Sequence, residues 1–280
     1  GDFVTLFAWH ADGTVMNAFW QKLKTTLEMI KFEHTLFALP FAFMGAILAA
    51  NGFPSWRQVL WITVAIVGAR SAAMKFNRII DRDIDAKNPR TAGREIPSGK
   101  LSVGFAWIFL YVSIGLFLLA SYSLNWLTFA LSPVALIVVL GYSYAKRFTV
   151  FAHLLLGLAL AIAPSAAWIA VRGSLDNELP ILLSLLVLMW TAGFDVMYAC
   201  QDFEFDRKSG LHSIPARFGI ANSLWIARLF HLQAFIVLVI LYLVSSLGWL
   251  ALAGVAAVAL PVLYQHQLLR AHDLDQRQGA

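Results

Sequence analysis

The sequence predicts an all-α, multi-span transmembrane helical bundle around a central cavity, and three observations support this fold class. Hydrophobic residues make up 60% of the 280-residue chain, and charged residues only 13%. The mean hydropathy is +0.71, whereas a soluble domain usually carries about 25% charged residues. Apolar stretches of about 20 residues, long enough to cross a bilayer, recur along the chain. The composition therefore excludes an ordinary soluble domain.

Eight apolar segments are candidate spans. They cover residues 28–50, 56–78, 103–122, 126–144, 150–171, 179–201, 221–245 and 248–268. Pro40, Pro133, Pro164 and Pro261 fall inside these segments. A helix bundle tolerates such prolines because neighbouring helices satisfy the freed backbone groups. Residues 1–23 mix aromatic and basic residues and are expected to form an interfacial tail, with one transmembrane domain over 24–280.

Basic residues are concentrated in the connections that follow the second, fourth and sixth spans. They are Arg82, Lys87, Arg90, Arg94 and Lys100, then Lys146 and Arg147, then Arg207, Lys208 and Arg217. Because basic loops remain on the cytoplasmic side, we expect both termini and these three connections there. The net charge of +5 thus reflects membrane topology, and no nucleic-acid partner is predicted. The single cysteine, Cys200, excludes an internal disulfide.

Acidic residues form two clusters at the cytoplasmic ends of predicted spans. One run contains Asn77, Asp81 and Asp85, and the other contains Asp195, Tyr198, Asp202 and Asp206. Residues four apart lie on one face of a helix, so each run predicts a polar stripe. Asp83 and Glu204 fall on other faces and are expected to be solvated. The similar arrangement of the two runs suggests an internal duplication.

Stacked carboxylates repel one another unless a cation lies between them. Mg²⁺ takes one or two carboxylates together with phosphate oxygens and water, so two facing clusters predict a magnesium-bound diphosphate. The alternative is that these charges mark the membrane boundary or pair with arginines, which explains one cluster better than two on the same side. No histidine spacing indicates zinc, and His34 and His153 are expected to be polar contacts near helix ends.

Basic side chains near the clusters are candidates for phosphate binding. Arg90 and Arg94 follow the first cluster, and Lys146 and Arg147 lie between the two. Arginine binds phosphate through two hydrogen bonds and lysine as a point charge. Lys146 and Arg147 have an alternative role as topology anchors. Arg70 lies about two turns inside the second span, where a charge is costly, so it is expected to face the cavity or pair with a carboxylate.

These motifs resemble the signatures of the UbiA family of intramembrane prenyltransferases, from about residue 28 to the end. The N-x-x-x-D-x-x-x-D motif is matched by Asn77, Asp81 and Asp85, the D-x-x-Y-A-x-x-D motif by Asp195, Tyr198 and Asp202, and the D-x-x-x-D motif by Asp202 and Asp206. Tyr142, Lys146 and Arg147 match Y-x-x-x-K-R. Residues 90–99 match R-T-x-x-R-P-x-P-S-G except at Glu95.

Two features depart from the usual family pattern. The family usually has nine spans, so we expect a further span beyond Ala280. The first span opens with Lys31-Phe-Glu-His34, where hydroxybenzoate-specific members more often have R-x-x-K-P. This version resembles a bacterial 4-hydroxybenzoate polyprenyltransferase-like branch. The resemblance therefore implies a bacterial inner-membrane protein with its active site facing the cytoplasm.

The resemblance implies a Mg²⁺-dependent enzyme that transfers a polyprenyl group from its diphosphate to an aromatic acid such as 4-hydroxybenzoate, in ubiquinone or menaquinone biosynthesis. It implies two Mg²⁺ ions held by Asn77, Asp81, Asp85, Asp202 and Asp206. It implies substrate contacts at Lys31, Arg70, Arg90, Tyr142 and Arg147, and catalytic roles for Arg94, Lys146, Asp195 and Tyr198. Asp195 would orient the acceptor or take its ring proton, and Lys31 or Arg70 would bind its carboxylate.

Two alternatives remain open from the sequence. Within the family, the acceptor could instead be dihydroxynaphthoate, a haem or a chlorophyll-type molecule. In another class, a membrane transporter also has charged residues and internal repeats in a helix bundle. A transporter should carry its ionisable residues near the bilayer midplane, whereas here they lie at the span ends.

Overall fold

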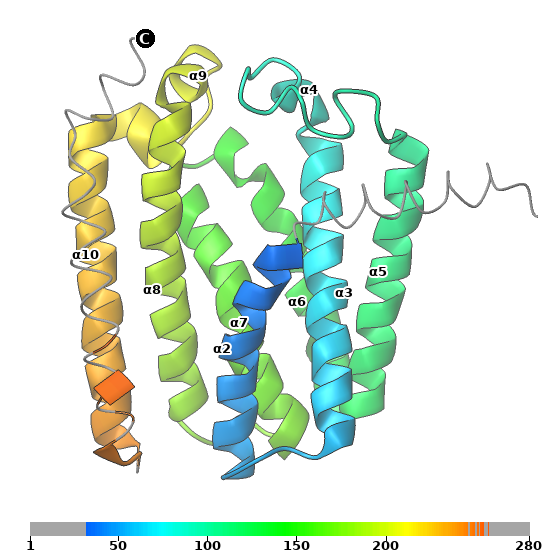
Figure 1. The fold of residues 1–280 in the computed structure, drawn as a ribbon, viewed down its shortest axis with the longest axis vertical. Coiled ribbons are helices and arrows are strands. Elements are labelled where there is room, and N and C mark those ends of the chain that lie inside the picture. Colours follow the sequence, from blue (N-terminus) through cyan, green and yellow to red (C-terminus); the bar gives the residue numbers. More distant parts are fainter. Residues whose placement is uncertain (1–31, 246, 250, 252, 255–256, 258–280) are drawn as a thin grey trace, which may run out of the picture.

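The computed structural model describes residues 32–245, 247–249, 251, 253–254 and 257, and this part of the chain contains helices and no strands. The long helices are α2 (Phe32–Ala50), α3 (Trp56–Ile80), α5 (Val103–Leu124), α6 (Trp126–Gly141), α7 (Ala152–Arg172), α8 (Leu179–Ala199) and α10 (Ile214–Val244). The short ones are α4 (Arg82–Asp85), η1 (Tyr142–Arg147), η2 (Cys200–Asp202) and α9 (Phe203–Lys208). The long helices run side by side as a bundle (Figure 1).

Six helical segments of the described chain are long and apolar enough to cross a membrane. They are Trp56–Ile80, Val103–Leu124, Trp126–Arg147, Ala152–Arg172, Leu179–Lys208 and Ile214–Val244. A shorter apolar stretch, Ala38–Ala50, lies in α2. The chain is therefore an integral membrane protein, as predicted. The expected tail 1–23 lies outside the described residues, and so does most of the expected eighth span; the total number of spans stays a prediction.

Polar residues at the start of several helices satisfy backbone groups that have no partner within the helix. Ser55 and Gln58 form a reciprocal capping box at the start of α3. Asn125 accepts a hydrogen bond from the Thr128 backbone N–H at the start of α6. The α10 helix starts at Ile214, earlier than the predicted 221, and Gly219 breaks its first turns with a φ of 78°. Glycine adopts this left-handed backbone conformation without steric cost.

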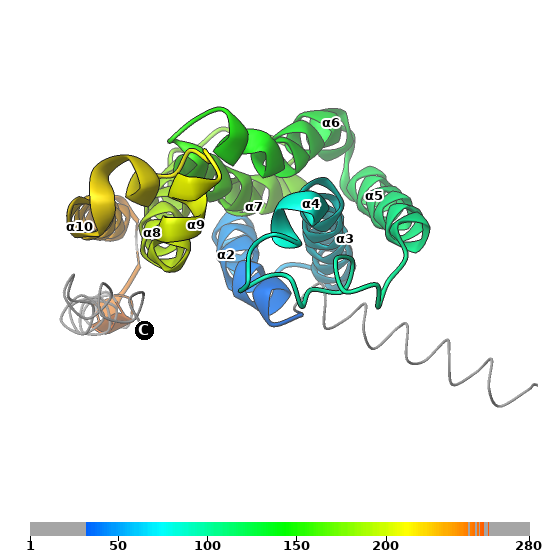
Figure 2. The ribbon, with the colours of Figure 1, turned by 90° about the horizontal axis from the view of Figure 1, so that it is seen from above.

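Small residues bring the central helices into close contact. In Figure 2 the bundle is seen from the end that carries α4 and α9. Here α7 packs against α2 and α8, α8 also packs against α10, and α3 packs against α5. A Cβ atom on Gly45 would lie 2.2 Å from the Pro164 carbonyl oxygen, and one on Gly157 would lie 2.5 Å from that of Leu188. The sequence predicted this close packing along the small-residue stretch of α7.

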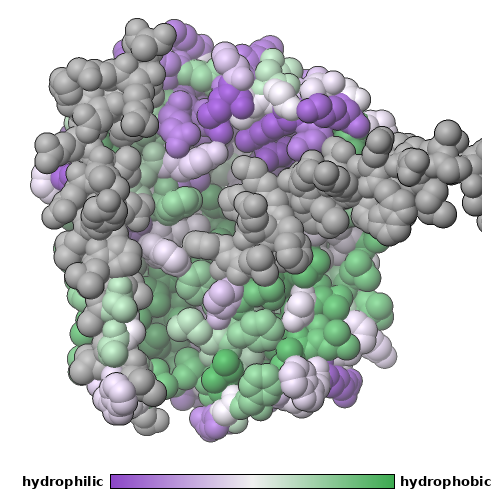
Figure 3. Space-filling view, in the orientation of Figure 1, coloured by the Kyte–Doolittle hydropathy of each residue, from purple (hydrophilic) through white to green (hydrophobic). Residues whose placement is uncertain are grey.

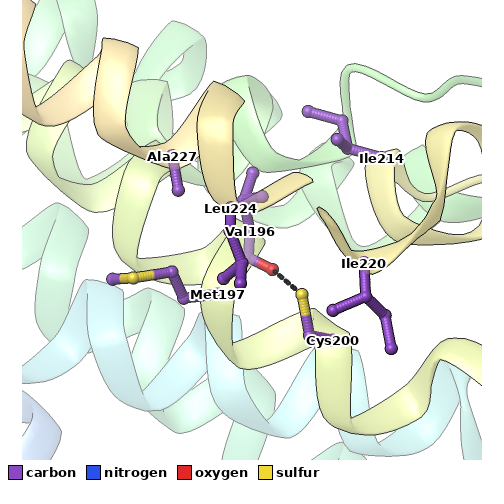
Figure 4. Close-up of a cluster of buried hydrophobic side chains, with 7 residues drawn as sticks. All are labelled: Val196, Met197, Cys200, Ile214, Ile220, Leu224 and Ala227. Carbon is purple, nitrogen blue, oxygen red and sulfur yellow. Dashed lines mark hydrogen bonds between the residues drawn. The ribbon is translucent and has the colours of Figure 1, made fainter. Parts of the chain in front are cut away.

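Buried apolar clusters lock pairs of helices together. Figure 4 shows the cluster between α8 and α10, in which Val196, Met197 and Cys200 meet Ile214, Ile220, Leu224 and Ala227. The Cys200 thiol is buried and donates a hydrogen bond to the Val196 carbonyl oxygen. This cluster fixes the end of α8 against the start of α10, where the second acidic run lies.

Hydrophilic residues gather at one end of the bundle. The short helices α4 and α9 lie at this same end (Figure 1), although residues of the intervening chain separate them. In Figure 3 the hydrophilic surface covers this end, above a broad hydrophobic belt. The two acidic runs therefore meet at one membrane face, as predicted from the basic connections.

Candidate functional site

A cavity of about 380 Å³ opens between the polar ends of α3 and α8. It brings together every predicted site residue except Lys31, which lies outside the described residues. The predicted residues that line it are Arg70, Asn77, Asp81, Asp85, Arg90, Arg94, Tyr142, Lys146, Arg147, Asp195, Tyr198, Asp202 and Asp206. The side chains of the two runs, distant in sequence, thus share one cavity.

A break between two helices lies within the first run, Asn77, Asp81 and Asp85. The α3 helix ends at Ile80, and Asp81 stands between it and α4. The Asp81 backbone N–H still donates to the Asn77 carbonyl oxygen at 2.9 Å, so the helical spacing continues through the break. The Asn77 side-chain amide donates to Asp81 Oδ2 at 2.8 Å. The predicted contact on one face is confirmed, although the helix is not continuous.

A 3-10 turn between two α-helices places the side chains of the second run in the cavity. The η2 turn joins α8 to α9, placing Asp202 at the end of the 3-10 segment and Asp206 within α9. Both carboxylates are buried, with 6% and 2% of the residue exposed, as is Asp85 at 5%. The side chain of Asp83, in contrast, is 82% exposed, and that of Glu204 is also solvated, as predicted.

Each of the four aspartates of the motifs faces one basic side chain. The pairs are Asp81 with Arg147 at 3.0 Å, Asp85 with Arg94 at 2.6 Å, Asp202 with Arg90 at 2.5 Å and Asp206 with Lys146 at 3.6 Å. Three of the pairs join parts of the chain that are far apart in sequence. The negative charges needed for a metal and the positive charges needed for a diphosphate are therefore already side by side.

The loop after α4 reaches across the cavity to the second run. Arg90 binds Asp202 and also donates from Nη1 to the Tyr198 hydroxyl at 2.9 Å, while its guanidinium lies 5.2 Å from the centre of the Tyr198 ring. Asn88 donates to Asp202 Oδ1 at 3.1 Å. The sequence did not single out Asn88; its place in the polar connection between Asp85 and Arg90 was the available signal.

The carboxylate oxygens fit a divalent cation. Asp85 Oδ2 and Asp206 Oδ2 are buried and accept no hydrogen bond from the described residues. Lys146 Nζ lies 3.6 Å from Asp206 Oδ2, whereas Arg94 binds the other oxygen of Asp85, so Asp85 Oδ2 is in the costly state that a nearby cation would relieve. Burial raises the pKa of the Asp81 carboxyl above its usual range, against the lowering effect of its hydrogen bond to Arg147. No three acidic, histidine or cysteine side chains converge within the described part. The donor set fits Mg²⁺ that also takes phosphate oxygens and water, rather than an all-protein cage.

The inner end of the cavity carries two buried polar atoms without a hydrogen-bond partner. Arg70 Nε and Thr191 Oγ1 are buried and form no hydrogen bond with the described residues. Arg70 and Tyr142 also line a second cavity of about 500 Å³. This second cavity extends among α3, α5, α6, α7 and α8 and is lined mainly by apolar side chains. A polar chamber and an apolar chamber therefore meet at Arg70 and Tyr142.

A buried histidine forms a hydrogen bond with Asp195. His153 Nδ1 lies 2.7 Å from Asp195 Oδ2, and the Ile214 backbone N–H donates to His153 Nε2 at 3.2 Å. The expected polar contact of His153 near a helix end is confirmed, but its partner was not predicted. The structure does not describe the side chain of His34.

The comparisons with known proteins agree with the geometry. The sequence pattern of the UbiA prenyltransferase family matches residues 38–280. The 4-hydroxybenzoate octaprenyltransferase of Aliivibrio fischeri strain MJ11 is 30% identical over 259 residues, which cover 91% of this chain and 87% of that protein. The enzyme of the same name from Alcanivorax borkumensis is 35% identical over 227 residues, covering 80% and 76%.

Solved structures show the same fold. A UbiA homologue from Aeropyrum pernix K1, solved in its apo form, is 34% identical, with a TM-score of 0.80 over 84% of this chain and 88% of that one. A UbiA homologue from Archaeoglobus fulgidus, solved with DMAPP and Mg²⁺ bound, is 21% identical with a TM-score of 0.70, over 87% and 86%. The second similarity supports the fold alone.

Proposed function

The chain belongs to the UbiA prenyltransferase family, and we propose that it transfers a polyprenyl group from its diphosphate to 4-hydroxybenzoate in a Mg²⁺-dependent reaction. As a member of this family it is an enzyme, so the transporter alternative is set aside. The observation that carries the proposal is the four-fold pairing of aspartates with basic side chains around one cavity. The names of the similar bacterial enzymes support the acceptor.

The residues of the two runs would hold the metal. Asn77, Asp81 and Asp85 would bind one ion, and Asp202 and Asp206 a second. When bound, Mg²⁺ neutralises the charge that develops on the departing diphosphate. The buried Oδ2 of Asp85, which has no hydrogen bond from the described residues, supports this assignment.

The basic side chains would bind the diphosphate. Arg94, Lys146 and Arg147 each lie beside one aspartate, so they need only turn toward phosphate oxygens when the metal takes the carboxylates. Arg90 would bind in the same way after releasing Asp202. Positive groups fixed at the position where charge develops lower the barrier to departure.

Transfer of the prenyl group follows from the positions of the aromatic side chains. The C1–O bond of the donor breaks and its electron pair leaves with the diphosphate. A ring face can stabilise the resulting allylic cation. The Tyr198 ring already lies close to the Arg90 guanidinium. We therefore assign stabilisation of the allylic cation to the ring of Tyr142, which lies where the two cavities meet. A ring carbon of the acceptor then bonds C1, and we assign removal of its proton to Asp195.

Arg70 would bind the carboxylate of the acceptor. Its guanidinium lies at the inner end of the polar cavity, and its buried Nε has no hydrogen-bond partner among the described residues. A charged group inside a membrane span is costly, and an aromatic carboxylate would reduce that cost. Thr191 offers its hydroxyl from the opposite helix. Lys31 stays a sequence prediction.

The apolar cavity would accommodate the first isoprene units of the donor. Its walls on α5, α6 and α7 are rich in alanine, leucine and valine, which can exclude water from a hydrocarbon chain. The basic connections support a cytoplasmic position for the polar cavity, in the inner membrane of a bacterium. Attaching a membrane-impermeant thiol reagent to cysteines introduced at Arg82, after Cys200 is replaced, would test this orientation.

The function is tested with purified protein, Mg²⁺ and one polyprenyl diphosphate, offered 4-hydroxybenzoate and 1,4-dihydroxy-2-naphthoate separately. We expect prenylated 4-hydroxybenzoate, identified by its mass, and no product when EDTA removes the metal. Product from the naphthoate alone would replace the acceptor with a menaquinone precursor. Absence of any prenylated product would contradict the proposal.

A further inference from the structure

His153 joins three helices at a point where no solvent reaches it. It is the second residue of α7 and its exposed fraction is 0%. Its two ring nitrogens contact Asp195 of α8 and the first backbone N–H of α10, at Ile214. Ile214 belongs to the first turn of α10, where backbone N–H groups have no partner within the helix. His153 supplies that partner.

The contact with Ile214 decides where the proton of His153 lies. A backbone N–H can only donate, so Nε2 must present its lone pair and carry no proton. In the neutral ring the proton is then on Nδ1 and is donated to Asp195 Oδ2. Asp195 Oδ2 is therefore the acceptor of this hydrogen bond. The orientation of the His153 ring fixes the position of the Asp195 carboxylate.

This arrangement exists in only one of the two acidic runs. Asp195 precedes Asp202 by the same interval that separates Met74 from Asp81, so methionine occupies the equivalent position in the first run. Both side chains line the polar cavity. A function shared by both runs, such as binding the metal and the diphosphate, does not need the Asp195–His153 pair. We therefore expect the pair to serve a step that involves the second run and not the first.

The two runs also differ one helical turn further into the cavity. Thr191 lies one helical turn before Asp195 on the same face of α8, and its buried Oγ1 has no partner among the described residues. In the first run the position equivalent to Thr191 is Arg70. Thr191 thus lies beside Asp195, and Arg70 lines the same cavity.

We propose that His153 is a positioning residue that fixes the Asp195 carboxylate through the hydrogen bond to Oδ2, with its second oxygen directed to the acceptor, so that Asp195 removes the ring proton during prenyl transfer. The new carbon–carbon bond forms as the ring attacks C1. The C–H bond at the attacked carbon then breaks, its electron pair restores the aromatic ring, and the proton passes to the Asp195 carboxylate. This inference rests on the function proposed above.

Two variants separate the two contacts of His153. In His153→Gln the side-chain oxygen can accept from the Ile214 N–H, but the donor to Asp195 is lost. In His153→Asn the amide can donate to Asp195, but the acceptor for Ile214 is lost. We expect the glutamine variant to keep its Tm and to lose about tenfold in kcat, less than the roughly 10²- to 10⁴-fold of general base catalysis because Asp195 itself remains. The asparagine variant should show a lower Tm and nearly native kcat.

An isotope effect distinguishes a positioning role from a structural one. With 4-hydroxybenzoate deuterated at the attacked carbons, His153→Gln should show a larger primary deuterium isotope effect on kcat than the native enzyme, because proton removal becomes slower. His153→Asn should show a native isotope effect. In both variants the calorimetric affinity for Mg²⁺ with inorganic diphosphate should stay native, because the metal half of the site does not use this pair.

Native kcat and isotope effect in His153→Gln would overturn the inference, as would losses of kcat that follow the Tm in both variants. In the Asp195→Asn background, His153→Gln should produce no further loss of kcat; an additive loss would also overturn it. The proposed function fails separately, since its failure is the absence of prenylated product from the native enzyme.

Discussion

Arg90 binds Asp202 through two parallel hydrogen bonds, from Nε to Oδ1 at 2.8 Å and from Nη2 to Oδ2 at 2.5 Å. This two-point geometry is the strongest that an arginine and a carboxylate form. A metal that binds this carboxylate competes with Arg90, and a diphosphate offers Arg90 another anion to bind. The other three aspartates also lie beside a basic side chain, so binding of the metal and of the diphosphate should be coupled.

Coupled binding is measured by calorimetry. Mg²⁺ should bind the native protein weakly by itself and more tightly in the presence of inorganic diphosphate, by roughly 5- to 150-fold, the usual range of coupling between two ligands. Diphosphate affinity should rise by the same factor when Mg²⁺ is present. Equal Mg²⁺ affinity with and without diphosphate, after correction for Mg²⁺–diphosphate binding in solution, would contradict the exchange of partners.

Replacement of Arg94 should change two affinities in opposite directions. Arg94→Gln removes the cation that pairs with Asp85, so the affinity for Mg²⁺ alone should increase. The affinity for Mg²⁺ with diphosphate should fall, because one phosphate contact is lost. The control is Arg82→Gln, whose side chain is 46% exposed and pairs with the solvated Asp83. A decrease of both affinities in Arg94→Gln would indicate a structural role instead.

Arg70 should determine acceptor affinity and leave donor affinity unchanged. Arg70→Gln removes the positive charge but keeps polar atoms, so the KM for 4-hydroxybenzoate should rise about tenfold or more, as for the loss of a buried charge-assisted hydrogen bond. The KM for the polyprenyl diphosphate should stay native. Phenol, which lacks the carboxylate, should react equally well with both enzymes. A parallel increase in both KM values would contradict this assignment.

Gly157 should be needed for the contact between α7 and α8. In Gly157→Ala the new Cβ meets the Leu188 carbonyl oxygen at 2.5 Å, and overpacking of this kind costs typically about 1–3 kcal/mol. Because these helices carry His153 and Asp195, both Tm and kcat should fall. Gly115→Ala is the matched control, since a Cβ there has nothing within 4 Å. Equal Tm values for the two variants would contradict the packing.

The sequence was sufficient for the helices and for local contacts. Apart from the start of α10, apolar runs predicted the bounds of the described spans to within a few residues. The four-residue spacing predicted the contact between Asn77 and Asp81. The break of α3 at Asp81 was not predicted, because apolar periodicity continues to Ile80 and does not depend on the backbone angles of the next residue. The early start of α10 was also not predicted, because the residues before Gly219 are too polar to be recognised as part of a span.

Contacts between distant segments could not be predicted from spacing. Arg90 was expected to bind substrate, but its pairing with Asp202 depends on how a loop folds over the cavity. The contact between His153 and Asp195 depends on the packing of α7 against α8. The sequence indicated each of these side chains only through its residue type and its position near a span end. The partner of each became evident only when the helices were placed in three dimensions.

Prenyl transfer by Asp202→Asn, compared with Asp83→Asn, decides whether the buried aspartates of the two runs hold the metal and diphosphate. Both variants remove one negative charge near a span end, but Asp202 is buried in the cavity and Asp83 is solvated. We predict that kcat with Mg²⁺, a polyprenyl diphosphate and 4-hydroxybenzoate falls by roughly a hundredfold or more in Asp202→Asn and stays native in Asp83→Asn. Near-native turnover in Asp202→Asn would contradict the proposed site.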